Sequence, residues 1–141
     1  MSFTADISAF VRHANGDMDR VVRKIILDLG TRIVEKSPVG DATYWSSPPP
    51  PGYVGGRFRA NWQYQFGVVP SGVKDEISPT GAVSITSLLK VMTGPIRGIH
   101  FIANNLPYAQ RLENGWSRQA PRGMVGLTLG EFQNIVRGSI P

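Results

Sequence analysis

The sequence predicts a fold of the α+β class, in which helices and strands occupy separate parts of the chain. Three patterns indicate this class. Apolar residues recur at helical spacing in the first third, alternate with polar residues at residues 61–68, and return to helical spacing near the C-terminus. The chain has 141 residues, and domains commonly contain about 100–150. We therefore expect residues 1–141 to form a single domain around one core.

Two helices are expected in the first third of the chain. Ile7, Phe10 and Val11 have helical spacing and predict a short first helix. Asn15-Gly16 should interrupt it, and Asp17 is well placed to cap a longer second helix. The apolar residues of that second helix form one broad stripe, as expected for a helix that lies on a sheet: Met18, Val21, Val22, Ile25, Ile26, Leu29 and Ile33.

The second helix is expected to end at Ser37-Pro38, because the residue before a proline is disfavoured in the helical conformation. Gly30 lies inside this helix, where glycine costs about 1 kcal/mol relative to alanine. We interpret Gly30 either as a point where another backbone approaches the helix closely or as a tolerated residue without a special role.

A long segment rich in proline and glycine follows at residues 40–56. It contains four consecutive prolines, which exclude a helix or a central strand and favour an extended polyproline path. A connection of this length is unusual in a compact domain. Two interpretations stay open: a flexible surface loop, or an arm that orders on a neighbouring subunit with Tyr44, Trp45 and Tyr53 as aromatic anchors.

The middle of the chain predicts two strands with a short helix between them. Residues 61–68 alternate cleanly and place Trp62, Tyr64, Phe66 and Val68 on one face of a strand. Residues 84–92 have the apolar spacing of a short helix. Residues 96–103 form a mostly apolar run that is typical of a buried strand.

The last third predicts two more helices. Pro107 suits the first position of a short helix at residues 108–113, and Gly115 is expected to end it by adopting a positive φ. We expect Tyr108, Leu112 and Trp116 to belong to the core. An amphipathic helix at residues 124–136 then closes the chain.

No catalytic, cofactor or metal site is predicted. The chain has no cysteine, which excludes disulfides, thiolate nucleophiles and cysteine-bearing zinc sites. His13 and His100 lie far apart in sequence without partners at ligand spacing, so we interpret them as surface or packed imidazoles. Glycine-rich phosphate loops and the nucleophile motif of serine hydrolases do not occur in the sequence. We therefore expect a protein that is not an enzyme.

The sequence contains no recognisable membrane or targeting segment. No apolar stretch approaches the roughly 20 residues that a membrane-spanning helix needs. The N-terminus lacks the basic start and apolar run of a secretory signal. We expect a chain that is made and kept in the cytoplasm.

The net charge of +5 is distributed unevenly along the chain. Residues 1–36 hold six basic and five acidic side chains, whereas residues 37–141 hold nine basic and five acidic ones. A basic excess of this kind is compatible with nucleic acid or with an acidic protein surface. There is no run of consecutive lysines or arginines, so direct DNA binding is not the favoured interpretation. A nucleic-acid-binding module is kept as the alternative.

Two segments of the sequence resemble a known family. Residues 104–117 read Asn-Asn-Leu-Pro-Tyr-Ala-Gln-Arg-Leu-Glu-Asn-Gly-Trp-Ser, and Gln119-Ala120-Pro121 and Gly123-Met124 follow them. They resemble the C-terminal signature of minor tail or tail-completion proteins of tailed bacteriophages, in which an N-x-x-Y-A-x-x-x-E-x-G core precedes a proline and a closing helix. Upstream, Ser37-Pro38-Val39-Gly40 and residues 55–62 are similar to the a-P-v and t-G-x-L-R-x-S-W parts of that family. Phe58 stands where the family usually has leucine, and the proline-rich insert separates the two upstream parts more widely than usual.

The resemblance implies both an arrangement of the fold and a function. The long N-terminal helix and the C-terminal helix would pack on one face of a mostly antiparallel β-sheet, with the long Pro/Gly-rich loop between them. The protein would be a structural virion protein that forms a ring of six subunits, or a multiple of six, at the head-proximal end of the tail. Its partners would be the tail tube protein and the head connector or neck proteins. It would be assembled in the bacterial host cytoplasm and would reside in the virion.

The resemblance also directs attention to candidate residues at the subunit interface. Glu113 is the candidate for a buried or inter-subunit ion pair with Arg57, Arg59 or Arg118. The aromatic residues of the arm would contact a neighbouring subunit. The full set of candidate interface residues is Tyr44, Trp45, Tyr53, Arg57, Arg59, Glu113 and Arg118.

Overall fold

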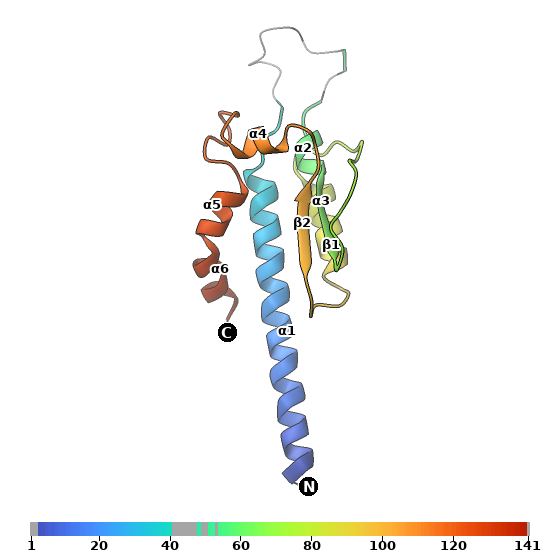
Figure 1. Cartoon of the computed structure of the whole chain (residues 1–141), viewed down its shortest axis with the longest axis vertical. Coiled ribbons are helices and arrows are strands. Elements are labelled where there is room, and N and C mark those ends of the chain that lie inside the picture. Colours follow the sequence, from blue (N-terminus) through green and yellow to red (C-terminus); the bar gives the residue numbers. More distant parts are fainter. Residues whose placement is uncertain (1–2, 41–47, 49–50, 53, 141) are drawn as a thin grey trace.

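The computed structural model describes residues 3–40, 48, 51–52 and 54–140. It confirms a fold that mixes helices with a sheet, with a long N-terminal helix and a two-stranded antiparallel sheet (Figure 1). In chain order the elements are α1 (Phe3–Lys36), α2 (Arg57–Ala60), β1 (Trp62–Phe66), α3 (Ala82–Val91), β2 (His100–Asn104), α4 (Ala109–Glu113), α5 (Val125–Gly130) and α6 (Phe132–Ser139).

Helix α1 is one continuous helix of 34 residues, which corresponds to about 51 Å at 1.5 Å per residue. The prediction of two helices separated at Asn15-Gly16 was wrong. Extending an existing helix through one glycine costs only about 1 kcal/mol, whereas starting a new helix requires an unfavourable nucleus. The Asp17 carboxylate, predicted as a cap, instead forms an ion pair with Arg20 one turn along the same helix.

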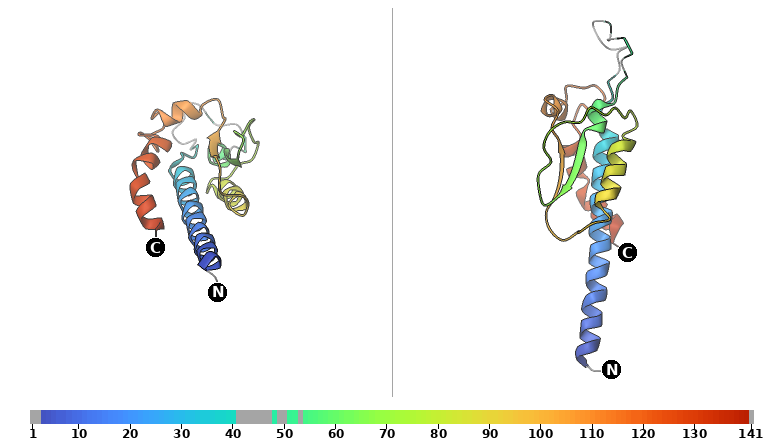
Figure 2. Two further views of the ribbon diagram at one scale, coloured as in Figure 1. Left: turned by 60° about the horizontal axis from the view of Figure 1, so that its bottom comes forward. Right: turned by 90° about the vertical axis from the view of Figure 1, so that its right-hand side faces the viewer.

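The first half of α1 extends beyond the rest of the molecule (Figures 1 and 2). Contacts with the body begin where Arg97 Nε donates to Asp19 Oδ1 at 3.2 Å, and continue where Arg23 Nη1 donates to the carbonyl oxygens of Met92 and of Gly94, the latter at 3.0 Å. From this level to Lys36, α1 contacts α3 as well as α5 and α6. We refer to residues 3–18 as the projecting segment.

The sheet consists of β1 and β2, paired so that Trp62 lies opposite Asn104 and Phe66 opposite His100. Trp62 and Tyr64 are buried and hydrogen-bond to α1 or the residue after it. The Trp62 indole N–H donates to Ser37 Oγ at 2.8 Å, and the Tyr64 hydroxyl donates to the Gly30 carbonyl at 3.3 Å. Burial also raises the pKa of the Tyr64 hydroxyl above its ordinary value. Both predicted strands are present and both are shorter than the segments that predicted them. The prediction of a buried strand at residues 96–103 was wrong in burial, because every residue of β2 is only half-buried.

Gly30 lies where α1, α3 and β1 meet. A Cβ atom added at this position would lie 2.5 Å from Leu88 Cδ2 and 2.9 Å from Tyr64 Cε1. The close approach predicted for Gly30 therefore exists, but it involves side chains rather than another backbone. The buried apolar core around this point comprises Ile33, Val34, Phe58, Trp62, Tyr64, Leu88, Met92, Ile96, Leu106, Ala120 and Met124.

The C-terminal segment forms two short helices rather than the single helix predicted at residues 124–136. A tighter turn at Glu131 separates the two helices, because the Glu131 backbone N–H donates to the Thr128 carbonyl, three residues back, at 3.1 Å. Thr128, Ile135 and Ser139 are buried, and α5 and α6 contact α1. The predicted packing of both terminal helices on one face of the sheet stays a prediction.

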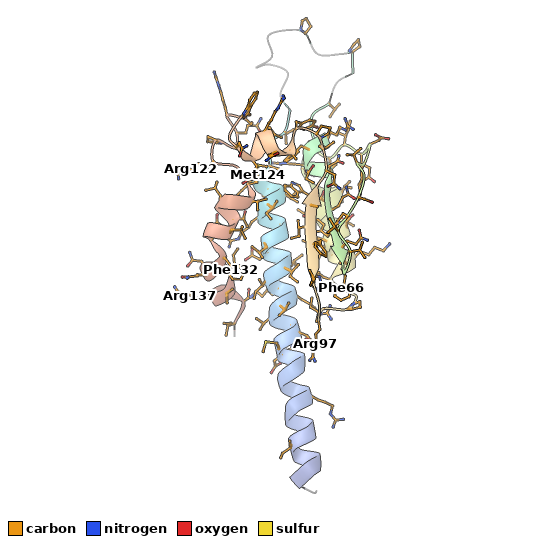
Figure 3. All side chains as sticks on the ribbon, in the orientation of Figure 1. Phe66, Arg97, Arg122, Met124, Phe132 and Arg137 are labelled. Carbon is orange, nitrogen blue, oxygen red and sulfur yellow. The ribbon has the colours of Figure 1, made fainter. Side chains whose placement is uncertain are left out.

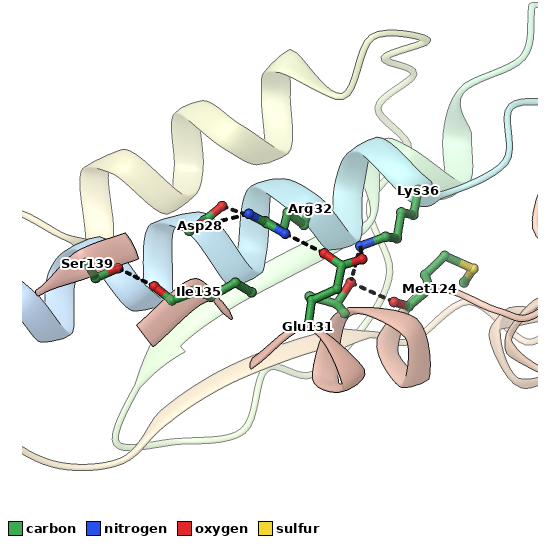
Figure 4. A network of polar contacts seen from close by, with 8 residues as sticks. Asp28, Arg32, Lys36, Met124, Glu131, Ile135 and Ser139 are labelled. Carbon is green, nitrogen blue, oxygen red and sulfur yellow. Dashed lines mark hydrogen bonds and ion pairs between the residues drawn. The ribbon is translucent and has the colours of Figure 1, made fainter. Parts of the chain in front are cut away.

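Ion pairs fasten the junction of α5 and α6 to α1 (Figure 4). The Arg32 guanidinium lies between Asp28, which Nε contacts at 2.8 Å, and Glu131. Lys36 Nζ lies 2.7 Å from Glu131 Oε1 and 3.1 Å from Thr128 Oγ1. Hydrogen bonds from Lys36 and then Arg32 hold the pKa of Glu131 below its ordinary value. The junction is therefore held by a network that requires an ionised carboxylate.

Candidate assembly surface

The segment of residues 104–124 lies at the end of the molecule opposite the N-terminus, together with α2 and α4 (Figure 1). Two asparagines attach it to the body. Asn104 Nδ2 donates to the Phe58 carbonyl at 3.0 Å. Asn105 Nδ2 lies 3.0 Å from the Pro70 carbonyl oxygen and 3.1 Å from that of Gly72. The first residues of the resemblance therefore connect β2 to α2 and to the loop after β1.

Glu113 organises the second half of this segment. Its Oε1 accepts the backbone N–H groups of Met124 and Val125 at 3.0 and 2.9 Å, and its Oε2 accepts that of Gly126 at 3.0 Å. These donors are at the start of α5, where N–H groups have no partner within the helix. Glu113 therefore acts as a cap contributed by a residue eleven positions upstream.

Within the single subunit, Glu113 forms no ion pair with Arg57, Arg59 or Arg118 among the described residues, and an ion pair between subunits stays a prediction. The carboxylate is directed to the amides of α5 instead, because three N–H donors and the positive helix end already satisfy it. Burial alone would raise the pKa of Glu113, and the three amide hydrogen bonds outweigh it, so the pKa lies below the ordinary value.

Two glycines make this closure possible. Gly115 has a φ of 90°, as predicted for the residue that ends α4, and Gly123 has a φ of 79°. A Cβ atom at Gly123 would lie 2.7 Å from Glu113 Oε2 and would also overlap the Glu113 carbonyl oxygen. Glu113, Gly115 and Gly123 therefore close the loop between α4 and α5.

Trp116 was predicted to belong to the core, and this prediction was wrong. Its side chain is 72% exposed, and the Arg111 guanidinium lies over the indole ring at 5.1 Å from its centroid. Leu112 is packed against the core, whereas Tyr108 is 37% exposed and its ring centroid lies 6.2 Å from that of Phe58. Closing the loop through Glu113 leaves the indole outside, where a cation–π contact stabilises it.

Arg111 and three further exposed arginines belong to elements at this end of the molecule. Arg57 belongs to α2 and Arg111 to α4, while Arg118 and Arg122 belong to the loop that follows α4. Figure 3 shows Arg122 on this loop, with its side chain directed away from the body. None of the four forms an ion pair with an acidic side chain in the part of the chain that the structure describes. We call these four arginines and Trp116 the basic end.

Arg59 differs from the arginines of the basic end because the fold itself uses its guanidinium. Its Nε donates to the Ser37 carbonyl at 2.7 Å, its Nη1 to that of Pro79 at 2.9 Å and its Nη2 to that of Glu35 at 2.9 Å. Two of these acceptors are at the C-terminal end of α1, where carbonyl groups have no partner within the helix. Arg59 thus caps α1, and its role at a subunit interface stays a prediction.

The three aromatic residues of the arm, Tyr44, Trp45 and Tyr53, lie outside the described residues. The two ends of the arm are described, and they lie next to each other. A Cβ atom at Gly55 would overlap the carbonyl oxygen of Gly40. Gln119 fixes this point, since Val39 N donates to its Oε1 at 2.9 Å and its Nε2 donates to the Val39 carbonyl at 2.7 Å. The arm therefore begins and ends beside the segment that carries the basic end.

The described residues contain no group of three His, Asp or Glu side chains placed to hold a metal ion. His100 packs against Phe66 with ring centroids 5.1 Å apart, and its Nε2 lies 2.7 Å from the Ile96 carbonyl oxygen. No helix within the described ranges is both long enough and apolar enough to cross a membrane.

The geometry at this end is thus a loop closed by Glu113, an exposed tryptophan and four arginines. Such a surface can bind an acidic partner, because arginine forms bidentate hydrogen bonds with carboxylates and phosphates. Comparison of the chain with protein-family models, with curated proteins and with solved structures gives no match.

Proposed function

We propose that this chain is a structural virion protein of a tailed phage or prophage. It forms a ring at the head-proximal end of the tail, where it completes the tail and joins it to the head. Its function is specific association, and no reaction is catalysed. The observation that carries this proposal is the projecting segment of α1, which extends about 24 Å beyond the first contacts with the body.

A helix in this position lacks most of what stabilises helices in proteins. Ile7 is 47% exposed and Met18 is 64% exposed, and Asn15-Gly16 contributes low helix propensity. Helices of about 12–15 residues are marginal in water unless an apolar face is packed. Contact with another subunit would supply that packing, which supports a protein that works in an assembly.

The residues behind the family resemblance also support assembly rather than catalysis. Asn104, Glu113, Gly115 and Gly123 all build the loop that displays the basic end. The resemblance therefore rests on residues that shape a surface.

The proposed ring is a cyclic homo-oligomer of six subunits or a multiple of six. Heterologous contacts close such a ring, and its symmetry would match that of a tail tube. One face would contact the tail tube protein and the other the head connector or neck proteins. The arm would reach a neighbouring subunit through Tyr44, Trp45 and Tyr53, and the terminal helices would share one face of the sheet.

Native mass spectrometry across a concentration series tests this proposal. We expect a closed oligomer of six subunits or a multiple of six, whose population rises with protein concentration. A variant that lacks residues 1–18 should remain folded, because the contacts with the body begin at Asp19, and it should lose the oligomer. A full-length chain that stays monomeric at every concentration would contradict the proposed ring.

The basic end favours one alternative, a phage-associated nucleic-acid-binding module. An exposed tryptophan beside exposed arginines combines base stacking with phosphate contacts. On this alternative, a gel-shift titration with single-stranded DNA shows binding that weakens steeply with salt, since released counterions drive the association. Trp116→Ala should then lower the affinity about fivefold or more, by analogy with stacking energies of about 1–3 kcal/mol per base. Absence of a shift at low salt would eliminate this alternative.

A further inference from the structure

We infer that the loop after β1 of one subunit binds the basic end of the next subunit. This loop comprises residues 67–77, and we call it the 67–77 loop. The inference rests on the proposed ring and identifies a contact within it, apart from the projecting segment. Both surfaces belong to this chain, so the occupant of each is a second copy of the same protein.

Side-chain amides fasten the 67–77 loop to β1 and to the residue before it. Asn61 is buried, and its Nδ2 donates to the Lys74 carbonyl at 3.0 Å while its Oδ1 accepts the Lys74 backbone N–H at 2.7 Å. Gln63 Nε2 donates to the Gly72 carbonyl at 2.9 Å. A loop that is already held in place loses little conformational entropy on binding, which favours association.

Although it is held in place, the 67–77 loop exposes four large apolar side chains. They are Val68, Val69, Val73 and Ile77, with exposed fractions between 48% for Val73 and 61% for Val68. Single exposed apolar residues are ordinary in soluble proteins, whereas four in a loop of eleven residues indicate a surface that is covered by a partner.

The same loop carries two adjacent carboxylates without a basic partner. Asp75 and Glu76 are exposed, and neither forms an ion pair with a described residue. Most other acidic side chains that the structure describes are occupied, by ion pairs at Asp17, Asp19, Asp28 and Glu131 and by backbone amides at Glu113. The 67–77 loop therefore offers unpaired negative charge beside exposed apolar groups.

The basic end offers the complementary surface. Arg118 and Arg122 are exposed, lie on the loop that Glu113 closes, and have no acidic partner in the described part of the chain. Trp116 is exposed on the same loop and can cover the apolar side chains of the neighbour. Tryptophan and arginine are enriched among the residues that dominate binding energies. Opposite charges on the two loops would set the orientation of the contact.

The two surfaces lie on opposite sides of α1. Figure 1 shows the 67–77 loop on the side of β1 and β2, at the right, and the loop between α4 and α5 at the left. Figure 2 also places the sheet and α5 on opposite sides of α1. A contact between two different surfaces is heterologous, and repeated heterologous contacts can close into a ring. In such a ring every subunit has both surfaces covered.

A second copy accounts for more of these observations than a nucleic acid does. A nucleic acid on the basic end would satisfy the arginines and would leave the apolar side chains of the 67–77 loop exposed. The carboxylates of Asp75 and Glu76 would repel phosphate groups, so the same strand would not cover that loop. Contact between copies covers both loops at once.

Charge reversal on each surface tests the contact. One variant combines Asp75→Arg with Glu76→Arg, and the other, with a tag of different mass, combines Arg118→Glu with Arg122→Glu. Each variant alone should raise the concentration needed for half-assembly by about tenfold or more, because like charges then face each other in every contact. Mixed in equal amounts, the two variants should form rings in which they alternate, because opposite charges then meet in every contact. Native mass spectrometry resolves these mixed rings.

A matched control changes the charge by the same amount elsewhere. Lys90→Glu on α3 combined with Arg137→Glu on α6 equals the charge change of Arg118→Glu with Arg122→Glu, and both positions are exposed. This control should assemble at the concentration of the natural protein. Circular dichroism of all variants should remain that of the natural protein, since every substituted side chain is exposed in the single subunit.

Fluorescence quenching provides a second measurement. Trp116 is 72% exposed in the single subunit, whereas Trp62 is buried. The iodide quenching that Trp116→Phe removes reports on Trp116. We expect this quenching at low protein concentration and its loss as the ring forms, because the 67–77 loop of the neighbour covers the indole.

The outcomes separate this inference from the proposed function. A ring that neither charge-reversed variant impairs overturns the inference and leaves the ring standing. Two impaired variants that mixing does not restore, or a Trp116 that iodide still quenches within the ring, do the same. If Arg118→Glu with Arg122→Glu abolishes binding to single-stranded DNA and leaves assembly unchanged, the basic end is a nucleic-acid site and the inference is overturned. A full-length chain that never associates overturns both proposals.

Discussion

Replacing Gly30 with alanine is expected to lower the free energy of unfolding by about 1–3 kcal/mol, although alanine is the better helix former. The added methyl group would lie 2.5 Å from Leu88 Cδ2 and 2.9 Å from Tyr64 Cε1, which is closer than carbon atoms can approach. Leu88 is fully buried and cannot move away without displacing its own neighbours. Urea denaturation monitored by tryptophan fluorescence would measure the change.

Gly16 provides the matched control within the same helix. A Cβ atom at Gly16 has no other atom within 4 Å, so Gly16→Ala carries the gain in helix propensity without the clash. It should increase helical content by circular dichroism and should not destabilise the protein. Equal effects of the two substitutions would contradict the packing described around Gly30.

Replacing Glu113 with alanine is expected to destabilise the protein by about 2–3 kcal/mol at neutral pH. The substitution removes the acceptor for three backbone N–H groups at the start of α5, and Met124, which provides one of them, is 1% exposed. Calorimetric unfolding would measure the loss. Glu76→Gln is a suitable control, because Glu76 is exposed and its substitution should have little effect.

The contribution of Glu113 should also depend on pH in a defined direction. Its pKa is lower in the folded protein than the ordinary value of 4.5, so the folded state favours the ionised carboxylate. Its contribution is therefore fully present above about pH 4.5 and is lost as the pH falls through the lowered pKa. Glu113→Gln cannot ionise, so the stability difference between the natural protein and this variant should shrink on acidification. A difference that stays constant between pH 7 and pH 3 would contradict the cap.

Local patterns in the sequence were sufficient to predict most of the individual elements. The alternation around Trp62 and Tyr64 predicted β1, and the spacing at residues 84–92 predicted α3, because each side of these elements meets a different environment. The end of α1 near Pro38 and the positive φ of Gly115 were also predicted, since both follow from the backbone conformations open to those residues. Such signals depend only on nearby residues.

The errors arose where contacts between distant residues decide the outcome. Asn15-Gly16 has the composition of a break, yet α1 continues through it, since propensity is a weak signal within a long helix. Trp116 is exposed because Glu113 closes the loop between α4 and α5. The spacing of apolar residues in the sequence does not reveal that closure. An acidic residue followed eleven to thirteen positions later by the start of a helix could have indicated a cap, but such spacing is common by chance.

Residue type alone also does not distinguish among the candidate interface arginines, whose role at an interface stays a prediction. Exposed Arg57 and Arg118 could be selected because arginines are frequent in interfaces. Arg59 could not be separated from them by residue type alone. Its difference lies in the three carbonyl oxygens that surround its guanidinium, which come from α1, from the residue after it and from the loop before α3.

The neighbouring positions of Gly40 and Gly55 have a bearing on how this protein can diversify. The chain leaves the body and returns to it at one place, held by Gln119, so the length of the segment between these glycines can change without moving either end. Doubling the length of such a closed excursion costs only about 0.6 kcal/mol of loop-closure entropy. Its sequence can therefore change in length and composition with little effect on the stability of the fold. An affinity tag inserted between these glycines is therefore expected to leave the scaffold undisturbed.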